Sequence, residues 1–241
     1  LGLMGPNARA ILSRLTPADL SDDAFPFATN RRIDVGYGVC IANRMTYVGE
    51  LGWELIVPTE FSVGIYEALV DAGKDLGIRN AGYYAIEALR LEKGFRAWGR
   101  ELMPDIDPWQ AGLGFALDLG KEGGFIGSDA IAAAKGRPLK KRIVQFTLDD
   151  GGPMLWGGEL ILRNGEPAGE LRSAAYGHSL GRAVGLGLVE SADGVDQRFL
   201  GEGRFEIDVA GMRHAAKPHL KPAYDPKGEK IRPPVPADKA A

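Results

Sequence analysis

Residues 47–55 read YVGELGWEL, and this segment places an acidic side chain in an unusual setting. Glu50 stands between Gly49 and Gly52, and the aromatic residues Tyr47 and Trp53 lie on either side of these glycines. Glycine lets a backbone turn tightly and approach a ligand, while aromatic side chains offer flat apolar surfaces to a planar ring. The segment therefore predicts either a contact with a planar ligand or, as the alternative, a hairpin turn in which Glu50 is solvated.

The carboxylate of Glu50 indicates what kind of ring it could hold. An ionised carboxylate has two acceptor oxygens, and the edge of a 2-amino-4-oxopteridine carries adjacent N–H donors that the two oxygens could accept together. This is the geometry of an arginine–carboxylate pair with the roles of protein and ligand exchanged. A buried bond of this kind contributes roughly 1.5–3 kcal/mol. The spacing alone still favours the solvated turn.

Strand-like and helix-like segments alternate around this motif up to about residue 135. Apolar runs predict strands at 1–4, 33–42, 44–47 and 53–57. The second and third of these strands are expected to pair with each other. Helices are expected after Gly5, from an N-cap at Thr59, and between Gly82 and Gly94, where Ala85, Ile86 and Leu89 would form the apolar face. This mixture predicts an α+β domain.

The sequence changes in character near residue 137. Short strand-like runs follow at 143–148, 159–163, 168–174, 184–189 and 205–209. Asn164-Gly165 stands between two of these runs and is a strong hairpin signal. We therefore predict a small all-β barrel or sandwich at residues 138–232, after an α+β domain at 1–137 and before a tail at 233–241.

The composition excludes several classes of protein. With 29 basic and 32 acidic residues, the net charge of −3 provides no excess of positive charge that would indicate nucleic-acid binding. No apolar run is long enough to predict a membrane helix. The single cysteine, Cys40, excludes an internal disulfide and is expected to be a buried thiol. The three histidines are scattered, so no metal site is expected.

Residues 44–55, RMTYVGELGWEL, resemble the Tyr-(Thr/Val)-Gly-Glu-x-Gly-x-Glu segment of the glycine-cleavage T-protein (aminomethyltransferase) family. The ending LGWEL is more similar to dimethylglycine and sarcosine dehydrogenases, whose C-terminal half is a T-protein-like module. Other family-like segments follow in the same order: GPNAR at 5–9, ALRLEKG at 88–94, WGREL at 98–102, AGL at 111–113, FIG at 125–127 and LKPAYDP at 220–226. The resemblance covers roughly residues 1–232.

The resemblance implies a T-protein-like folate-binding domain followed by a C-terminal β-barrel, with tetrahydrofolate in a central hole of a three-lobed fold. Glu50 matches the carboxylate that grips the pterin, and Tyr47 would lie beside it. Arg90 matches an arginine of the family motif, although a structural role as a helix-surface partner of Glu87 is the alternative. Trp98, together with Arg96, would border the benzoyl-glutamate part of the folate or serve only in packing. Core packing is likewise the alternative for Trp53.

The implied activity is that of an enzyme module. Tetrahydrofolate would accept a methylene unit from a small-molecule methylamine donor and form 5,10-methylenetetrahydrofolate. The implied protein partner is an upstream flavin domain, as in the dehydrogenases, or a lipoyl carrier protein, as in glycine cleavage. The sequence LGWEL at residues 51–55 favours the dehydrogenase type. No nucleic-acid or membrane partner is expected. The implied location is the cytoplasm, or the mitochondrial matrix in a eukaryote.

The resemblance also indicates what we do not expect in this chain. T-proteins carry an essential aspartate in a lobe before the Gly-Pro helix start, and Leu1 begins inside a predicted strand, so we expect a fragment or a processed product. Asp34 and Asp105 do not stand in the matching context, and the catalytic residue is left unassigned. No Gly-x-Gly-x-x-Gly fingerprint follows a strand, so FAD would bind only to a domain outside this chain.

Two alternatives stay open. The same scaffold could be a non-catalytic or repurposed folate-binding protein, because a fold does not determine a function. The chain could also be inactive alone if part of the pocket wall lies upstream. A third idea is set aside: residues 174–181 contain His178 and Ser179, but no acidic residue at readable spacing accompanies them, so a serine-type catalytic site is not predicted.

Overall fold

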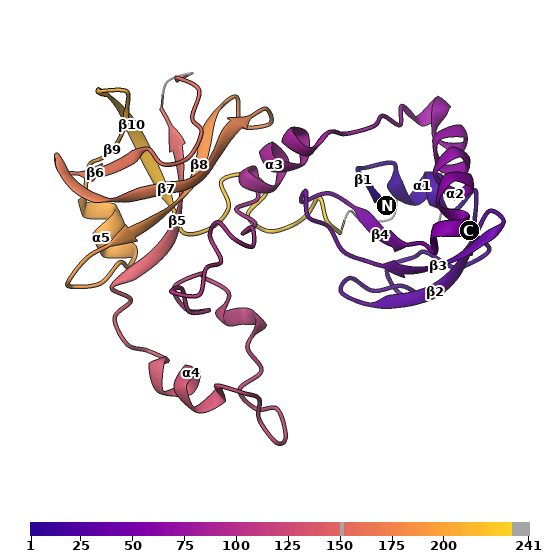
Figure 1. The fold of residues 1–241 in the computed structure, drawn as a ribbon, viewed down its shortest axis with the longest axis horizontal. Helices are drawn as coiled ribbons and strands as arrows, with labels where there is room; N and C mark the ends of the chain where they lie inside the picture. Colours follow the sequence, from indigo (N-terminus) through magenta and orange to yellow (C-terminus); the bar gives the residue numbers. More distant parts are fainter. Residues whose placement is uncertain (150–151, 233–241) are drawn as a thin grey trace. The chain divides into compact units, whose positions relative to one another are not determined.

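The computed structural model describes residues 1–149 and 152–232, so the predicted tail at 233–241 lies outside the described residues. The chain divides into two compact units (Figure 1). Among the described residues, one unit comprises Leu1–Ile86 and residues 227–232, and the other comprises Glu87–Pro226. Each unit has its own hydrophobic core.

The first unit is an antiparallel sheet with helices packed on one face. The strands are β1 (Gly2–Met4), β2 (Asn30–Val35), β3 (Gly38–Asn43) and β4 (Gly52–Ile56), in the spatial order β1-β4-β3-β2. The helices are α1 (Ala8–Leu12), α2 (Thr59–Ala72) and the short η1 (Lys74–Leu76). The α+β character predicted for this part of the chain is confirmed.

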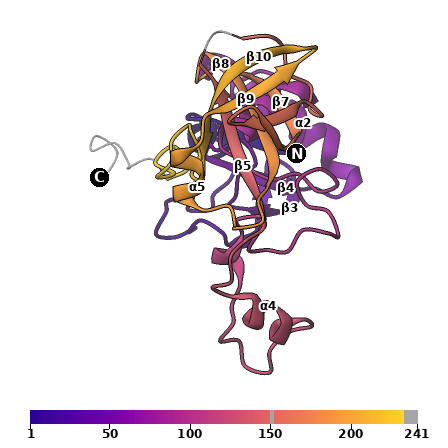
Figure 2. The same ribbon diagram turned by 90° about the vertical axis from the view of Figure 1, so that its left-hand side faces the viewer.

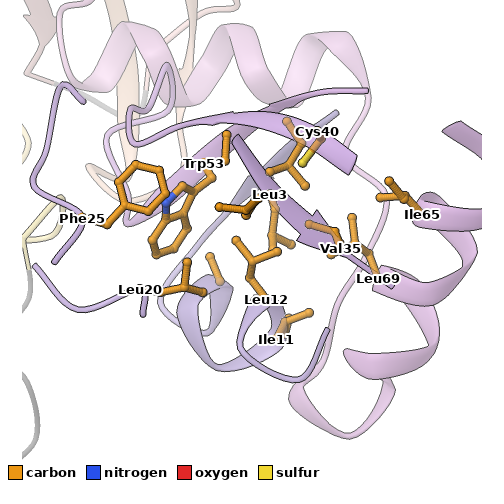
Figure 3. Close-up of a cluster of buried hydrophobic side chains, with 14 of the residues drawn as sticks. Leu3, Ile11, Leu12, Leu20, Phe25, Val35, Cys40, Trp53, Ile65 and Leu69 are labelled. Carbon is orange, nitrogen blue, oxygen red and sulfur yellow. The ribbon is translucent and has the colours of Figure 1, made fainter. Parts of the chain in front are cut away.

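Trp53 belongs to this unit's core, which gathers side chains from the sheet, α1, α2 and the connection before β2, and it lies beside Phe25 (Figure 3). The indole ring is 0% exposed and packs edge-to-face on Phe25, with ring centroids 6.2 Å apart. Cys40 is buried in the same cluster, as predicted. Because Trp53 is enclosed by protein, its expected packing role is confirmed, and its flat surface is not open to a ligand.

The strand prediction around residue 36 was wrong. Residues 33–42 do not form one strand, because the chain reverses at Gly36 and Tyr37 between β2 and β3, which pair with each other. Gly36 has φ +57°, which side-chain-bearing residues rarely adopt, and Tyr37 is fully exposed. Residues 44–47, predicted as the partner strand, belong to the loop between β3 and β4.

Two details of the helices also differ from the prediction. Thr59 is the first residue of α2 rather than its N-cap, since Pro58 holds the cap position without a side-chain hydrogen bond. The helix predicted between Gly82 and Gly94 is α3 (Tyr83–Glu92), but its expected apolar face is not its buried face. The buried residues are Ala88, Arg90, Leu91 and Glu92. Arg90, Leu91 and Glu92 are consecutive, so the last turn of α3 is buried on several sides, and hydrophobic periodicity misses it because two of the four buried residues are charged.

The second unit contains a closed barrel, which confirms the prediction of a C-terminal all-β domain (Figure 2). Its strands are β5 (Lys141–Leu148), β6 (Leu160–Arg163), β7 (Glu166–Gly177), β8 (Arg182–Glu190), β9 (Phe205–Val209) and β10 (Met212–His219), and α5 (Gln197–Glu202) precedes β9. The barrel order is β10-β5-β8-β7-β6-β9. Asn164 and Gly165 have φ +55° and +88° and join β6 to β7, which confirms the predicted hairpin.

Strand β10 was not predicted, because only Ala216 among its eight residues is buried. Its pairing with both β5 and β9 closes the barrel. Between α3 and β5 the chain forms η2 (Gly114–Ala116) and α4 (Ser128–Ala134). Helix α4 buries no residue and lies at the end of a loop that extends away from the barrel in both views (Figures 1 and 2). No helix within residues 1–149 and 152–232 is long and apolar enough to cross a membrane.

Gly38 tests the packing of α2 on the sheet. A Cβ at this position would lie 2.8 Å from Cβ of Phe61 and 2.9 Å from Cδ1 of Ile65, both on α2. We expect Gly38→Ala to lower the free energy of unfolding by about 1–3 kcal/mol, measured by urea denaturation, because the helix must move outward. Gly64→Ala is the matched control: Gly64 is exposed within α2 with open space around it, and alanine there should stabilise by about 0.5–1 kcal/mol. Equal effects of the two substitutions would contradict this packing.

His219 on β10 predicts a pH dependence of stability. Burial lowers the pKa of the imidazole, Lys217 and Arg182 lower it further, and Nε2 lies 2.9 Å from Oγ1 of Thr147. The folded state therefore binds fewer protons at this site than the unfolded state, so stability must fall as the pH drops below about 6.5. We expect His219→Gln to lose less stability than wild type between pH 7.5 and 5.5 in urea titrations. His178→Gln controls for the loss of a histidine, and a pH dependence unchanged in His219→Gln would refute the assignment.

Candidate functional site

The loop at residues 44–51 carries Glu50, and the hydroxyl group of Thr46 organises its turn. Oγ1 of Thr46 accepts hydrogen bonds from the backbone N–H groups of Val48, Gly49 and Glu50, at 3.2, 3.1 and 3.3 Å. Gly49 has φ +78°, so the turn at this point requires glycine. The side chains of Glu50 and Tyr47 are both half-buried on this loop. The structure thus places the first two predicted site residues together, three positions apart on one ordered turn.

Arg44 joins the beginning of this loop to its end. Its guanidinium is 0% exposed and donates from Nη1 to the carbonyl of Gly52 at 3.1 Å. Nη2 donates to the carbonyl of Ile231 at 2.8 Å and approaches Oδ1 of Asp22 at 3.4 Å. Burial lowers the pKa of Arg44, and the charge of Asp22 opposes that shift. The guanidinium also lies over the ring of Trp53, 4.8 Å from its centroid, so the loop is tied to the core.

The end of the loop requires close approach of two strands. A Cβ on Gly52 would lie 2.6 Å from Cγ of Met4 and 2.8 Å from the carbonyl oxygen of Leu3. The N–H of Gly5 donates to the carbonyl of Leu51 at 2.8 Å. The two glycines of the motif therefore have different roles: Gly49 permits the turn, and Gly52 permits β1 and β4 to pair.

Arg90 lies in the second unit and has a structural environment. It is 0% exposed and bonds to Glu87 through Nε and Nη2, which confirms the interaction predicted for this pair, although the pair does not lie on an exposed helix surface. Nη1 donates to Oε2 of Glu101 and to the carbonyl of Phe95, each at 3.0 Å. The buried charge of Arg90 is thus matched by two carboxylates.

Glu101 connects Arg90 to the segment that carries Trp98. The Glu101 side chain is fully buried, and Oε2 also accepts the N–H of Ala97 at 2.7 Å. Trp98 follows Ala97 directly and is 89% exposed. Its ring therefore faces solvent on a loop that the buried side chain of Glu101 anchors. Arg96 is half-buried and donates to the carbonyls of Ala111 and Gly94, and burial lowers its pKa. Arg90 and Trp98 are therefore linked through Glu101.

A second buried carboxylate in this unit was not predicted. Glu92 accepts hydrogen bonds from N and Oγ of Ser179, at 2.7 and 3.0 Å, and from N of Leu180 at 3.0 Å. Glu92 therefore holds the turn between β7 and β8, and both the N–H and the hydroxyl group of Ser179 donate to it. Lys93, the next residue, donates to Oδ2 and the carbonyl of Asp225 at 3.0 and 2.7 Å. The family-like run 88–94 thus contains several buried polar side chains, and the sequence signal that could have revealed them is three charges within four residues at the end of a predicted helix.

A hollow beside β2 and β3 and the distribution of metal-ligating side chains also bear on ligand and metal binding. A shallow hollow of about 430 Å³ lies beside β2 and β3, lined by Thr16, Arg32 and Asp34 among others, and none of the four predicted site residues lines it. Over residues 1–149 and 152–232, no group of three or more His, Cys, Asp or Glu side chains is arranged to hold a metal ion. The four predicted residues thus form two pairs, Glu50 with Tyr47 in the first unit and Arg90 with Trp98 in the second.

Comparison with known proteins gives this arrangement a family. The GCVT N-terminal domain matches residues 1–121, and the glycine cleavage T-protein C-terminal barrel domain matches residues 141–225. The chain belongs to the glycine cleavage T-protein family. The two matches leave residues 122–140 between them, and the predicted domain boundary at 137–138 falls in this interval and stays a prediction.

Curated relatives of this family member are longer proteins. The chain is 40% identical over 232 residues to 4-methylaminobutanoate oxidase (formaldehyde-forming) of Paenarthrobacter nicotinovorans, a match that covers 96% of the chain and 27% of the oxidase. It is 44% identical over 218 residues to human mitochondrial dimethylglycine dehydrogenase, covering 90% of the chain and 24% of that enzyme. The chain thus spans about a quarter of the length of these two relatives.

A solved structure has the same fold. The glycine cleavage system aminomethyltransferase T from Bartonella henselae matches with a TM-score of 0.73, covering 89% of the chain and 56% of that structure. The sequence identity in this match is 24%, so it supports the T-protein-like fold alone.

The buried network around Arg90 predicts a large stability effect. Arg90→Met leaves Glu101 buried without its ion partner, and we expect it to lower the free energy of unfolding by about 3–5 kcal/mol in urea denaturation. Arg100→Met is the control: Arg100 also pairs with Glu87, at 3.1 Å, but is 48% exposed, so a loss below about 1 kcal/mol is expected. Similar losses in the two variants would contradict a structural role for Arg90.

Proposed function

We propose that this chain is a tetrahydrofolate-binding one-carbon module that forms 5,10-methylenetetrahydrofolate from a methylamine donor. The observation that carries the proposal is the ordered loop at 44–51, which holds a half-buried carboxylate, Glu50, between two glycines in a member of the T-protein family. An acceptor of this kind fits the adjacent N–H donors of a pterin edge. Tyr47, half-buried on the same loop, would lie beside the ring.

In this proposal the chain supplies binding and orientation. Bound tetrahydrofolate supplies the N5 and N10 amines that take up the one-carbon unit. Glu50 accepts two N–H groups of the pterin, so the folate is held by a charge-assisted pair of bonds in one orientation. Holding two reacting groups in place converts a bimolecular step into a unimolecular one, which is the main contribution expected of such a site. The residue that steers the proton transfers is left unassigned.

We propose a supporting role for the second pair of residues. Arg90 and Glu101 hold the loop at 97–101, and the exposed ring of Trp98 on this loop is available to the benzoyl-glutamate part of the folate. In this arrangement Arg90 acts on the folate through the position of Trp98. An exposed tryptophan on an anchored loop supports the assignment, because aromatic side chains bind flat rings with little loss of conformational freedom.

The donor is proposed from the relatives. The names of the two long relatives describe N-methylated amino acids, dimethylglycine and 4-methylaminobutanoate. We therefore propose a small N-methylated amino acid as donor and a flavin domain outside this chain as partner. The flavin would take two electrons from the N-methyl group, and the resulting iminium carbon would pass to tetrahydrofolate with release of the demethylated amine. In a glycine-cleavage version the partner is a lipoyl carrier protein that delivers an aminomethyl group, and no oxidation is needed. The proposed location is the cytoplasm, or the mitochondrial matrix in a eukaryote, and the name of the human dehydrogenase describes that protein as mitochondrial.

One observation favours the alternative, a non-catalytic or repurposed folate-binding protein. The name of the oxidase describes it as formaldehyde-forming, and formaldehyde is the one-carbon product that a productive folate module would capture. A rate measurement distinguishes a module that captures formaldehyde on tetrahydrofolate from a protein that only binds folate. When formaldehyde and tetrahydrofolate are mixed with the chain, a productive module accelerates formation of 5,10-methylenetetrahydrofolate, whereas a binder leaves the rate unchanged.

The pterin contact is tested by titrating the chain with folinate, a stable reduced folate. We expect measurable binding by wild type and at least a tenfold weaker Kd for Glu50→Gln, which corresponds to about 1.4 kcal/mol. Glu60→Gln, an exposed acid in the first turn of α2, is the charge-matched control and should bind within twofold of wild type. Equal affinity of wild type and Glu50→Gln would overturn the pterin assignment, and absence of binding by wild type would overturn the proposed function.

A further inference from the structure

Thr46 occupies an unusual position in the loop that carries Glu50. Its Oγ1 accepts three consecutive amide N–H groups, those of Val48, Gly49 and Glu50, within 3.1–3.3 Å. The hydroxyl group is itself a donor to Sδ of Met4, at 3.7 Å. One side-chain oxygen therefore satisfies three backbone donors in a partly buried turn, where each would otherwise need its own acceptor.

This arrangement sets the direction of the residue that bears the carboxylate. The N–H of Glu50 points at Thr46, and the carbonyl of the next residue, Leu51, accepts the N–H of Gly5 at 2.8 Å. The bond from Nη1 of Arg44 to the carbonyl of Gly52 closes the loop one residue further on. The backbone on both sides of Glu50 is thus anchored, and its Cα–Cβ direction is defined before any ligand arrives.

We infer that Thr46 is a positioning residue that acts through Glu50 on pterin binding, an inference that rests on the proposed function. Two parallel bonds to a planar edge require both carboxylate oxygens to lie in the plane of the ring, so a small rotation of the backbone at Glu50 weakens both bonds together. A binding group works best when neighbouring residues hold it in the productive geometry beforehand. The Thr46 hydroxyl provides this support directly at the residue that binds.

A merely structural role for Thr46 would give a different pattern of affinities. If Thr46 only stabilised the fold, its removal would weaken folinate binding to a similar degree whether or not Glu50 could make its charged contact. If Thr46 acts through Glu50, the effects of the two substitutions on the Kd must be coupled. Once Glu50→Gln has removed the charged acceptor, a shift of the backbone at residue 50 has little further effect on folinate binding. A double-mutant cycle measures this coupling.

The experiment measures the Kd of folinate for wild type, Thr46→Val, Glu50→Gln and the double variant of the chain. Valine keeps the shape of threonine and removes the acceptor, so we expect Thr46→Val to weaken binding at least fivefold. In the Glu50→Gln background the same change should weaken binding less than twofold. Thr46→Ser retains the oxygen and should stay within twofold of wild type. Near-UV circular dichroism, to which the buried Trp53 contributes, verifies folding, and Thr46→Ala replaces Thr46→Val in the cycle if the valine variant does not fold.

The outcomes separate this inference from the function on which it rests. Failure of wild type to bind folinate overturns both. Binding by wild type with unchanged affinity in Thr46→Val, or with equal losses in the wild-type and Glu50→Gln backgrounds, overturns the positioning role and leaves the pterin contact of Glu50 standing. Loss of binding in Thr46→Ser equal to that in Thr46→Val also overturns it, because the hydroxyl oxygen would then not be the group that matters.

Discussion

A buried guanidinium cannot remain without partners, and both compact units of this protein are organised around one. Removing a charge from water costs several kcal/mol unless carbonyl or carboxylate oxygens replace the water. In the first unit Arg44 meets this requirement with the carbonyls of Gly52 and Ile231 and with Asp22. In the second unit Arg90 meets it with two carboxylates and a carbonyl. Each arginine thereby ties together chain segments that are far apart or that would otherwise be mobile loops.

This constraint divides the polar residues of the family-like motifs into two kinds. Four of these residues are enclosed and form hydrogen bonds with the backbone, with neighbouring charges or, in one case, with a hydroxyl group: Arg44, Arg90, Glu92 and Glu101. Glu50 and Trp98 are carried by the loops that those residues hold, one half-buried and the other exposed. A run of charged and aromatic residues in a motif therefore contains both buried residues that support a loop and loop residues that could contact a ligand. Only the burial of each side chain in the folded protein distinguishes the supporting residues from the candidate ligand contacts.

The same division bears on how a site of this type would work. The described loops at 44–51 and 97–101 carry a carboxylate acceptor and an aromatic ring on anchored supports. Such a set suits a reaction in which the folate provides the reactive amines and the protein provides orientation. The loss of conformational freedom that this orientation requires takes place during folding. The hydrogen bonds to Thr46 and the ion pair of Arg90 with Glu101 are formed before a ligand binds.

Local features were readable from the sequence, and features that depend on distant partners were not. The Asn164-Gly165 turn could be predicted because positive φ is a property of those two residues, and Glu50 could be singled out by the glycines around it. Strand β10 could not, because its strand character comes from pairing with β5 and β9 rather than from its own apolar residues. The burial of Arg90 was also decided by tertiary structure. Glu101 becomes its partner only when the chain folds back, and without that carboxylate a charge on that helix face would have to remain in water.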